Sequence, residues 1–204
     1  MKISDQDKAA IKEFIKQAEA NTSGEFVPVI LSSSDHYPAA HYRLAIILGG
    51  IVPLTYNYFN DANAIITLWA TLSGLLLGYL LAYIPLLKRA FTTQAEINEE
   101  TYQRDLQAYY ELGVTNTKDR TGVMIFLTLL ERKVFILADN GINSVVEKDF
   151  WQRQVKILTE SIKQNSFISG MEQVLLNIGK QLKSSFPIAD NDENELEDKL
   201  YTDM

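Results

Sequence analysis

Three acidic residues at the ends of apolar runs have the clearest potential for chemistry in this 204-residue sequence. Glu25 begins one such run, Asp119 precedes a second and Asp139 follows a third. If the runs are strands of one open α/β sheet, the three acids lie beyond strand ends, where ligands gather in such sheets. Converging carboxylates supply the oxygen ligands that Ca²⁺ or Mg²⁺ prefers. The pattern therefore predicts a metal set of Glu25, Asp119 and Asp139.

A structural role explains the same three acids without a ligand. Aspartate favours turns and helix caps because its side chain accepts hydrogen bonds from nearby backbone N–H groups. No catalytic set accompanies the acids: the chain has no cysteine, no glycine-rich phosphate loop, no Ser-His-Asp arrangement and no HExxH motif. His36 and His41 are five residues apart and lack further ligand residues, so we expect them at a membrane interface. Both interpretations of the acids stay open.

The elements that must position these residues form a small α/β domain. Strands are expected at 25–31, 121–130 and 134–138, and the short link between the last two predicts an antiparallel hairpin. Pro28 favours an edge position or a bulge for the first strand. Amphipathic periodicity predicts a helix before this strand, one before the second strand and two after the third. The order predicts a three-layer α/β/α sandwich.

The longest apolar stretch interrupts this domain after its first strand. Two uncharged runs, 44–59 and 64–87, are separated only by Asn60-Asp61-Ala62-Asn63. As helices they span ~24 Å and ~36 Å, against a hydrocarbon core of ~30 Å. We expect a transmembrane helical hairpin within residues 42–89, with helices at about 43–59 and 64–87. A buried core hairpin or a re-entrant loop is the alternative, which Pro53 and the short first run favour.

The charges beside the hairpin predict its orientation. Arg43, Lys88 and Arg89 stand at its outer ends, while the connecting turn carries only Asp61. Positive residues stay on the cytoplasmic side of a membrane protein. We therefore expect a two-pass protein of the bacterial inner membrane, with the lipid bilayer as one partner and the soluble domain in the cytoplasm.

Glycines in the second apolar run predict close helix packing. Gly74 and Gly78 form a GxxxG pattern, which lets two helices approach closely. They could pack against Gly49 and Gly50 within the hairpin, or form a homo-oligomer with a second copy. The sequence leaves both open.

Charge is concentrated at the end of the chain. Seven acids against the single Lys199 lie between residues 190 and 204, so this tail supplies −6 of the formal charge of −7. The nearly neutral remainder gives no electrostatic footprint for nucleic acid. We expect residues 189–204 to be a solvated, disordered tail. The soluble domain is then discontinuous, formed by residues 1–41 and 90–188.

Several short motifs stand out along the chain. They are Ala18-Glu-Ala-Asn-Thr-Ser-Gly-Glu25, Leu112-Gly-Val-Thr115, Arg120-Thr-Gly-Val-Met-Ile-Phe126, Glu131-Arg-Lys-Val-Phe-Ile-Leu-Ala-Asp-Asn-Gly-Ile142, Trp151, Gly170, Phe186-Pro187 and Asn194-Glu-Leu-Glu-Asp198. Together they resemble the TPM domain family, whose members include thylakoid-lumen proteins of photosystem repair and a nematode receptor modulator. The similarity is closest to a bacterial branch with a membrane hairpin after the first strand. That branch often ends with Asn-Glu-Leu-Pro-Asp, and here Glu197 replaces the proline.

The resemblance implies an α/β/α sandwich, calcium binding by carboxylates at one end of the sheet in some members, and acid phosphatase activity attributed to plant members. The positions in matching motifs are Glu25, Asp119 and Asp139. Phosphoryl transfer needs stabilisation of the transferred charge, and only Lys118 and Arg120 stand nearby to supply it. We expect a membrane-tethered binding or scaffolding module that assists the assembly, maintenance or regulation of another membrane protein. A metal-dependent phosphatase is the alternative, and no cofactor other than Ca²⁺ or Mg²⁺ is expected.

Overall fold

The chain divides into two compact units in the computed structural model, which describes residues 3–188 and 194–204. The sheet unit comprises Met1–Ser33 and Tyr102–Met204, and the hairpin unit comprises Ser34–Thr101. The boundaries predicted at 41 and 90 therefore fall inside the hairpin unit. The difference arises because the hairpin unit also includes the first two turns of α5, the helix that follows the apolar stretch.

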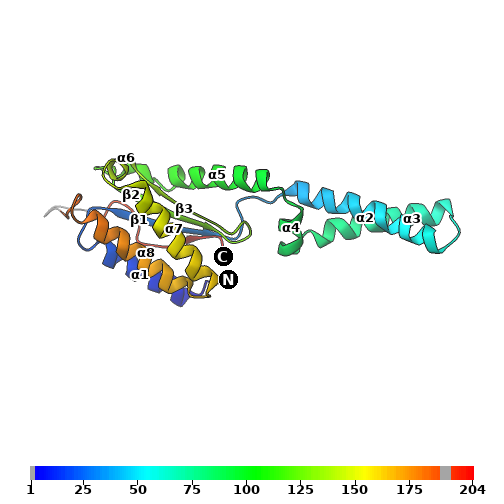
Figure 1. Ribbon diagram of the computed structural model, residues 1–204, viewed down its shortest axis with the longest axis horizontal. Coiled ribbons are helices and arrows are strands. Elements are labelled where there is room, and N and C mark those ends of the chain that lie inside the picture. Colours follow the sequence, from blue (N-terminus) through cyan, green and yellow to red (C-terminus); the bar gives the residue numbers. More distant parts are fainter. Residues whose placement is uncertain (1–2, 189–193) are drawn as a thin grey trace. The chain divides into compact units, whose positions relative to one another are not determined.

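Figure 1 labels all the elements of the two units except η1 and β4. In the hairpin unit they are α2 (Pro38–Phe59), α3 (Ala64–Leu81) and α4 (Pro85–Phe91), and α5 (Gln94–Glu111) runs on into the sheet unit. The sheet unit contains α1 (Asp5–Glu19), β1 (Glu25–Leu31), the 3₁₀ turn η1 (Val114–Asn116), β2 (Gly122–Thr128), β3 (Lys133–Ala138), α6 (Asn140–Asn143), α7 (Lys148–Lys163), α8 (Phe167–Leu182) and β4 (Tyr201–Thr202).

The sheet is mixed, with the strand order β3-β2-β1-β4. β1 is parallel to both of its neighbours, and β2 pairs with β3 as the predicted antiparallel hairpin. Helices α1, α7 and α8 cover one face, and the second half of α5 covers the other (Figure 1). The structure thus confirms an α/β fold with helices on both faces of the sheet.

Side chains of β2 alternate between the two cores. Ile125 and Leu127 pack among α1, α7 and α8, whereas Met124 and Phe126 pack with Ala108 and its neighbours on α5. Every residue of β2 is buried. A strand that is covered on both faces needs no polar side, which explains the unbroken apolar run in the sequence.

β1 is an internal strand, so the edge position inferred from Pro28 is wrong. The N–H of Glu25 donates to the Thr121 carbonyl on the β2 side, and the next N–H, of Phe26, donates to the Glu19 carboxylate on the opposite side. Backbone groups alternate in this way along a strand, so the missing N–H of Pro28 also faces away from β2. β4 pairs with β1 only beyond Pro28, and no ladder hydrogen bond is lost.

The end of the chain is ordered where the structure describes it, in contrast to the predicted disorder of 189–204. Residues 189–193 lie outside the described residues. Beyond them, β4 extends the sheet and Leu200, 7% exposed, enters the larger core. The Asp203 carboxylate accepts hydrogen bonds from the N–H and hydroxyl of Ser32, at 2.8 and 2.6 Å. The prediction failed because it rested on the acidic composition of the segment, whereas Leu196, Leu200 and Tyr201 pack against the two cores.

The hairpin unit brings α2 and α3 together through the predicted glycines. A Cβ added to Gly74 or to Gly78 would lie 2.4 Å from a backbone carbonyl oxygen of α2. Gly49 faces Gly74, but Gly50 has open space around its Cα. The glycine face of α3 is therefore used inside the hairpin, and the same face is covered against a second copy in this arrangement.

α3 ends earlier than the sequence predicted. The helix expected to run to residue 87 stops at Leu81, and a separate α4 begins at Pro85. The cause is Pro85, which lacks an N–H and whose ring clashes with the preceding turn. At 18 residues α3 spans ~27 Å, close to a hydrocarbon core. Within residues 3–188 and 194–204, α3 alone is long and apolar enough to cross a membrane, by length and composition.

Arg43 in α2 is held by an ion pair within the hairpin unit. Its guanidinium donates to both carboxylate oxygens of Glu96, at 2.7 and 2.8 Å, and to the Phe91 carbonyl. The Arg43 guanidinium, followed by the N–H of Thr93, lowers the pKa of Glu96 to about 2. The bidentate pair fixes the Arg43 side chain and neutralises a positive charge that flanks the hairpin in the sequence.

Candidate functional site at the amino edge of the sheet

The three predicted acids lie along one edge of the sheet. Glu25 is opposite Gly122 in the register of β1 and β2, and the N–H of Asp139 donates to the Gly122 carbonyl. Asp119 is exposed in the loop before β2, and its carbonyl oxygen approaches Gly141. This is the edge where the parallel strands β1 and β2 begin. Ligands of open α/β sheets more often bind at the opposite, carboxyl edge.

Asp139 is both a helix cap and one half of an ion pair. One carboxylate oxygen accepts the N–H of Asn140 at 2.6 Å, at the start of α6. The other lies 2.9 Å from Nε of Arg120, which is half exposed, while Asp139 is 3% exposed. Tyr109 lies over the same corner, and burial, reinforced by the charge of Asp139, raises its pKa to about 12. Tyr109 therefore stays a neutral phenol at physiological pH.

The carboxylate of Glu25 binds the end of the chain. It accepts the N–H groups of Glu195 and Leu196, at 3.2 and 3.3 Å. Glu195 in turn accepts the backbone N–H of Lys118 at 3.0 Å, so the C-terminal segment is attached on two sides. Burial raises the pKa of Glu25, the two N–H groups oppose this, and the carboxylates of Glu195 and Asp198 add to the rise.

Glu19, which was not among the predicted site residues, belongs to the same corner. Its carboxyl accepts the Phe26 N–H at 2.9 Å and forms a hydrogen bond with Asp198. Burial raises the pKa of Glu19 to about 9, with the charges of Glu25 and Asp198 adding to it. Glu19 is therefore protonated at neutral pH. Its one sequence signal is the Ala18–Glu25 motif, because Asp198 is distant in the chain.

Protein groups already contact two of the three acids predicted to bind a cation. Both oxygens of Glu25 and one oxygen of Asp139 accept hydrogen bonds from N–H groups, and Arg120 lies beside the other oxygen of Asp139, which is buried and accepts no hydrogen bond. In the part of the chain that the structure describes, no three His, Cys, Asp or Glu side chains are grouped as metal ligands. A cation at Glu25, Asp119 and Asp139 would require the C-terminal segment or Arg120 to move.

His41 has a structural environment in the hairpin unit. Its ring packs against Tyr79 and Tyr83, and Nδ1 lies 3.1 Å from the Tyr79 carbonyl oxygen. At 6% exposed it is buried between α2 and the end of α3. The aromatic contacts explain its position without a metal.

Comparison with known proteins gives one family and one solved structure. Residues 89–181 match the TPM domain. The NMR structure of the BA42 protein from the psychrophilic bacterium Bizionia argentinensis is similar with a TM-score of 0.62, over 99% of this chain and 96% of that one. Its sequence identity is 19%, so this similarity concerns the fold alone. No curated protein sequence matches the chain.

The matched segment extends from α4 to α8 and includes Asp119, Arg120 and Asp139, but not Glu25. The motifs quoted from the sequence that lie in this segment run from Leu112 to Gly170. The resemblance to the TPM domain family is therefore confirmed for residues 89–181.

Proposed function

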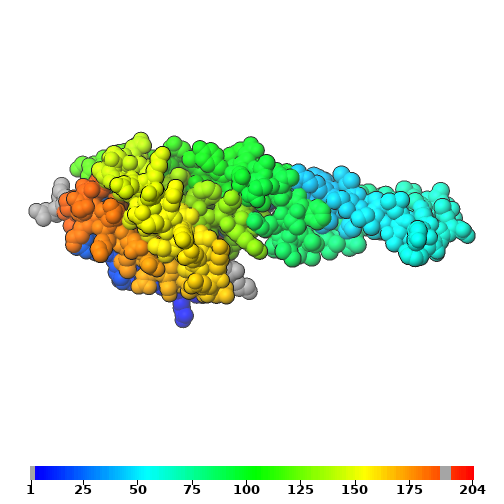
Figure 2. Space-filling view, in the orientation of Figure 1, coloured from blue at the N-terminus to red at the C-terminus, as the bar shows by residue number. Residues whose placement is uncertain are grey.

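We propose that this protein is a membrane-tethered binding module, in which an apolar hairpin anchors a TPM-like α/β domain that assists another membrane protein. The observation that carries the proposal is the exposed apolar surface of α2 and α3, the helices coloured from light blue to cyan-green in Figure 2. Large apolar side chains that are more than half exposed there include Ile46, Leu54, Ile65, Leu68, Trp69 and Leu76. Water disfavours a continuous surface of this kind, and a bilayer accepts it.

The inner-membrane location and the cytoplasmic orientation are part of the proposal. Lys88 and Arg89 lie at the base of the hairpin in α4, whereas Asp61 lies in the turn between α2 and α3. Arg43 is neutralised by Glu96, so the positive-inside argument rests on the α4 pair. Reporter fusions at Asn60 and at the C-terminus test it. We expect cytoplasmic activity at the C-terminus and external activity at Asn60, and the reverse pattern would overturn the orientation.

The binding role is supported by the state of the acidic edge. Its buried carboxylates accept hydrogen bonds from the protein itself, and no nucleophile–base pair is found there among the described residues. Co-purification in mild detergent is the test. We expect a membrane protein to be recovered with the full chain and lost when Leu68, Leu72 and Leu76 are all replaced by lysine. Recovery of the same protein with that variant would contradict the need for a tether.

The alternative proposal, a metal-dependent phosphatase using Glu25, Asp119 and Asp139, has a separate assay. The full chain in detergent is compared with the triple variant Glu25→Gln, Asp119→Asn, Asp139→Asn, using an aryl phosphate and Mg²⁺ or Ca²⁺. The binding role predicts no turnover above that of the variant. Turnover that disappears in the variant would favour the phosphatase.

A further inference from the structure

A buried acid lies in the middle of α5. Asp105 is 1% exposed, and its Oδ1 has no hydrogen-bond partner among the described residues. Within residues 3–188 and 194–204 it also forms no ion pair. Aspartate is almost never fully buried unless another group pairs with it, because an isolated buried carboxylate is costly to keep charged. The surroundings of Asp105 therefore favour its neutral, protonated form.

The position of Asp105 on α5 explains its burial. It precedes Ala108 by three residues and Tyr109 by four, so the three side chains lie on one face of the helix. Ala108 and Tyr109 pack in the smaller of the two cores, against apolar side chains of β1, β2 and β3. Asp105 therefore stands in the row of side chains through which the second half of α5 packs on the sheet.

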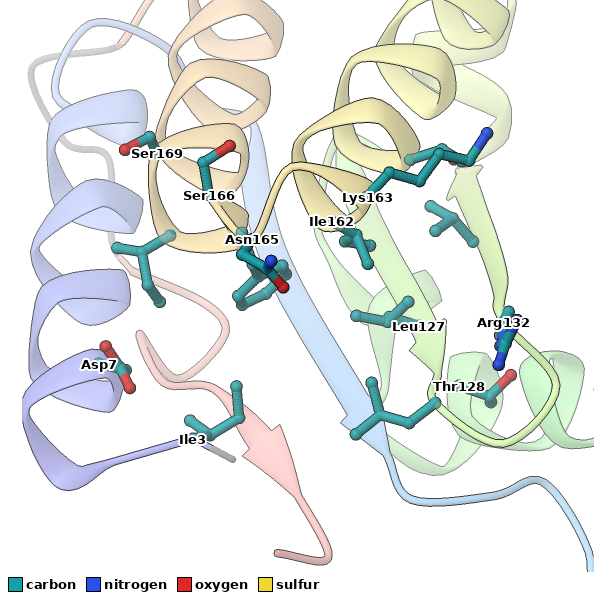
Figure 3. Close-up of a pocket in the computed structure, with 15 residues that line it drawn as sticks. Ile3, Asp7, Leu127, Thr128, Arg132, Ile162, Lys163, Asn165, Ser166 and Ser169 are labelled. Atoms are coloured by element: carbon teal, nitrogen blue, oxygen red, sulfur yellow. The ribbon is translucent and has the colours of Figure 1, made fainter. Parts of the chain in front are cut away.

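The large cavity of the sheet unit does not reach Asp105. This cavity, of about 1150 Å³, lies where β2 ends, beside the α7–α8 connection and the start of α1 (Figure 3). Its apolar lining includes Leu127 and Phe167, which belong to the larger core, and no residue of α5 lines it. With only 1% of its surface exposed, Asp105 becomes hydrated only when α5 moves away from the sheet.

Charges on the neighbouring elements do not compensate a charge on Asp105. Burial alone raises the pKa of Asp105 to about 7, and no charged group among the described residues contributes to this rise. β2 and η1 have no titratable side chain. The titratable groups that alternation places on the α5 face of the other strands, together with those of the β2–β3 turn and of the same face of α5, are Glu25, Lys133, Asp139, Tyr201, Asp203, Glu131 and Tyr109.

We propose that Asp105 is a proton-dependent switch: the protonated carboxyl keeps the second half of α5 packed on the sheet, and the charged carboxylate loosens it. The charged form gains its hydration only when the helix leaves the sheet. α5 continues from the hairpin unit into the sheet unit, so the proton acts on the element that joins the two. The inference requires neither the membrane tether nor a ligand at the acidic edge.

The direction of the pH effect follows from two pKa values. An exposed aspartate titrates near ~3.9. Between this value and about 7, the packed helix holds a proton that the detached helix has released. The packed form is therefore favoured most below pH ~3.9, and this preference falls by up to about tenfold per pH unit as the pH rises toward 7. Above the folded pKa the preference changes little further.

Hydrogen exchange of the full chain in a neutral detergent tests the switch. The amides of residues 105–109 are followed at pH 5.5 and pH 7.5, and protection factors correct for the pH dependence of exchange itself. The quantity compared is the ratio of protection at pH 5.5 to protection at pH 7.5. We expect this ratio to be at least tenfold larger in wild type than in Asp105→Asn, because asparagine has no proton to lose. Equal ratios in the two proteins would overturn the proposal.

Two further variants make the result specific. Asp105→Ala lacks both the proton and the amide, so it should give the small ratio of Asp105→Asn even if asparagine packs poorly at this position. Glu111→Gln is the matched control, because Glu111 is an exposed acid of the same helix. It should keep the wild-type ratio. A wild-type ratio in Asp105→Ala, or an equal reduction of the ratio in Glu111→Gln, would also contradict a switch at Asp105.

Discussion

Glu19 shows how a single residue makes this fold sensitive to pH. Its pKa is raised to about 9 by burial and by the neighbouring Glu25 and Asp198. An unfolded glutamate titrates near ~4.3, so between these values the unfolded chain releases a proton that the folded chain retains. The stabilisation is complete below pH ~4.3 and is lost progressively as the pH rises toward 9.

Glu19→Gln should remove part of this dependence. Glutamine keeps the acceptor for the Phe26 N–H and can donate to Asp198, but it carries no proton to lose. We expect an unchanged melting temperature at pH 5 and a rise of ~2–4 °C at pH 8, which corresponds to ~1 kcal/mol for a chain of this size. Thermal melts at both pH values measure it. A lower melting temperature at pH 8 would refute the raised pKa.

Asp139 separates the two interpretations of the acidic edge. Asp139→Asn weakens the Arg120 contact and should cost ~1–3 kcal/mol, because Asp139 is buried. If protein donors alone occupy the edge, wild type melts identically in Ca²⁺, Mg²⁺ and EDTA. A calcium-dependent rise in wild type that is absent in Asp139→Asn would instead establish the cation site predicted from the sequence.

The sequence located only part of this site. Glu25 and Asp139 could be placed at one edge because each adjoins a strand end, and the strands were correctly recognised. Glu19 and Asp198 could not be paired, because their contact joins the first helix to the end of the chain. The ion pair between Arg120 and Asp139 could not be predicted either, because an arginine in a loop belongs to no periodic pattern that would show its partner.

At the scale of elements, the C-terminal segment should contribute to stability. Leu200→Ala removes a core side chain and should destabilise the chain by ~2–5 kcal/mol in urea unfolding. Glu197→Ala is the control, because its side chain is exposed and forms a surface ion pair with Lys199. We expect ~0.5 kcal/mol or less for the control. If neither substitution changed the free energy of unfolding, the result would favour a disordered tail, as predicted from the sequence.

The glycines of the hairpin allow a similarly matched comparison. Gly78→Leu places a side chain against the α2 backbone and should separate the helices, whereas Gly50→Leu meets open space. The chain lacks cysteine, so the double substitution Asn57→Cys, Thr67→Cys introduces a single cysteine pair. The native side chains at these positions hydrogen-bond at 3.1 Å, so disulfide cross-linking reports how close α2 and α3 are. We expect cross-linking to persist with Gly50→Leu and to fall severalfold with Gly78→Leu. An equal yield in both would show that the glycine contact is dispensable.

Elements with strong local patterns were predicted well. Where each element ends, and which element it pairs with, was predicted less well. The β2–β3 hairpin, for example, follows from residues that are adjacent in the chain. The end of α3 was misplaced because hydropathy continues past Leu81, although Pro85 prevents one continuous helix. β4 was missed because a two-residue strand has no periodicity of its own.

At the scale of the whole molecule, the apolar insertion and the α/β domain could both be recognised because their compositions differ so strongly. The boundary between them was harder to place, since α5 contributes residues to both units. Hydropathy also cannot distinguish a helix that crosses a bilayer from one that packs on protein. In the hairpin unit, only 11% of α3 is buried within the protein, which favours a helix that contacts lipid over one that packs on protein.

Extraction of membranes with alkaline carbonate tests the tether most directly. Cells expressing the full chain are compared with cells expressing the variant in which Leu68, Leu72 and Leu76 on the exposed surface of α3 are replaced by lysine. Charges at the centre of a spanning helix cost ~2.5–3.5 kcal/mol each, so the variant should not insert stably. We predict that the wild-type chain stays in the membrane pellet and that the variant appears in the supernatant. Release of the wild-type chain by carbonate would contradict membrane anchoring by the hairpin.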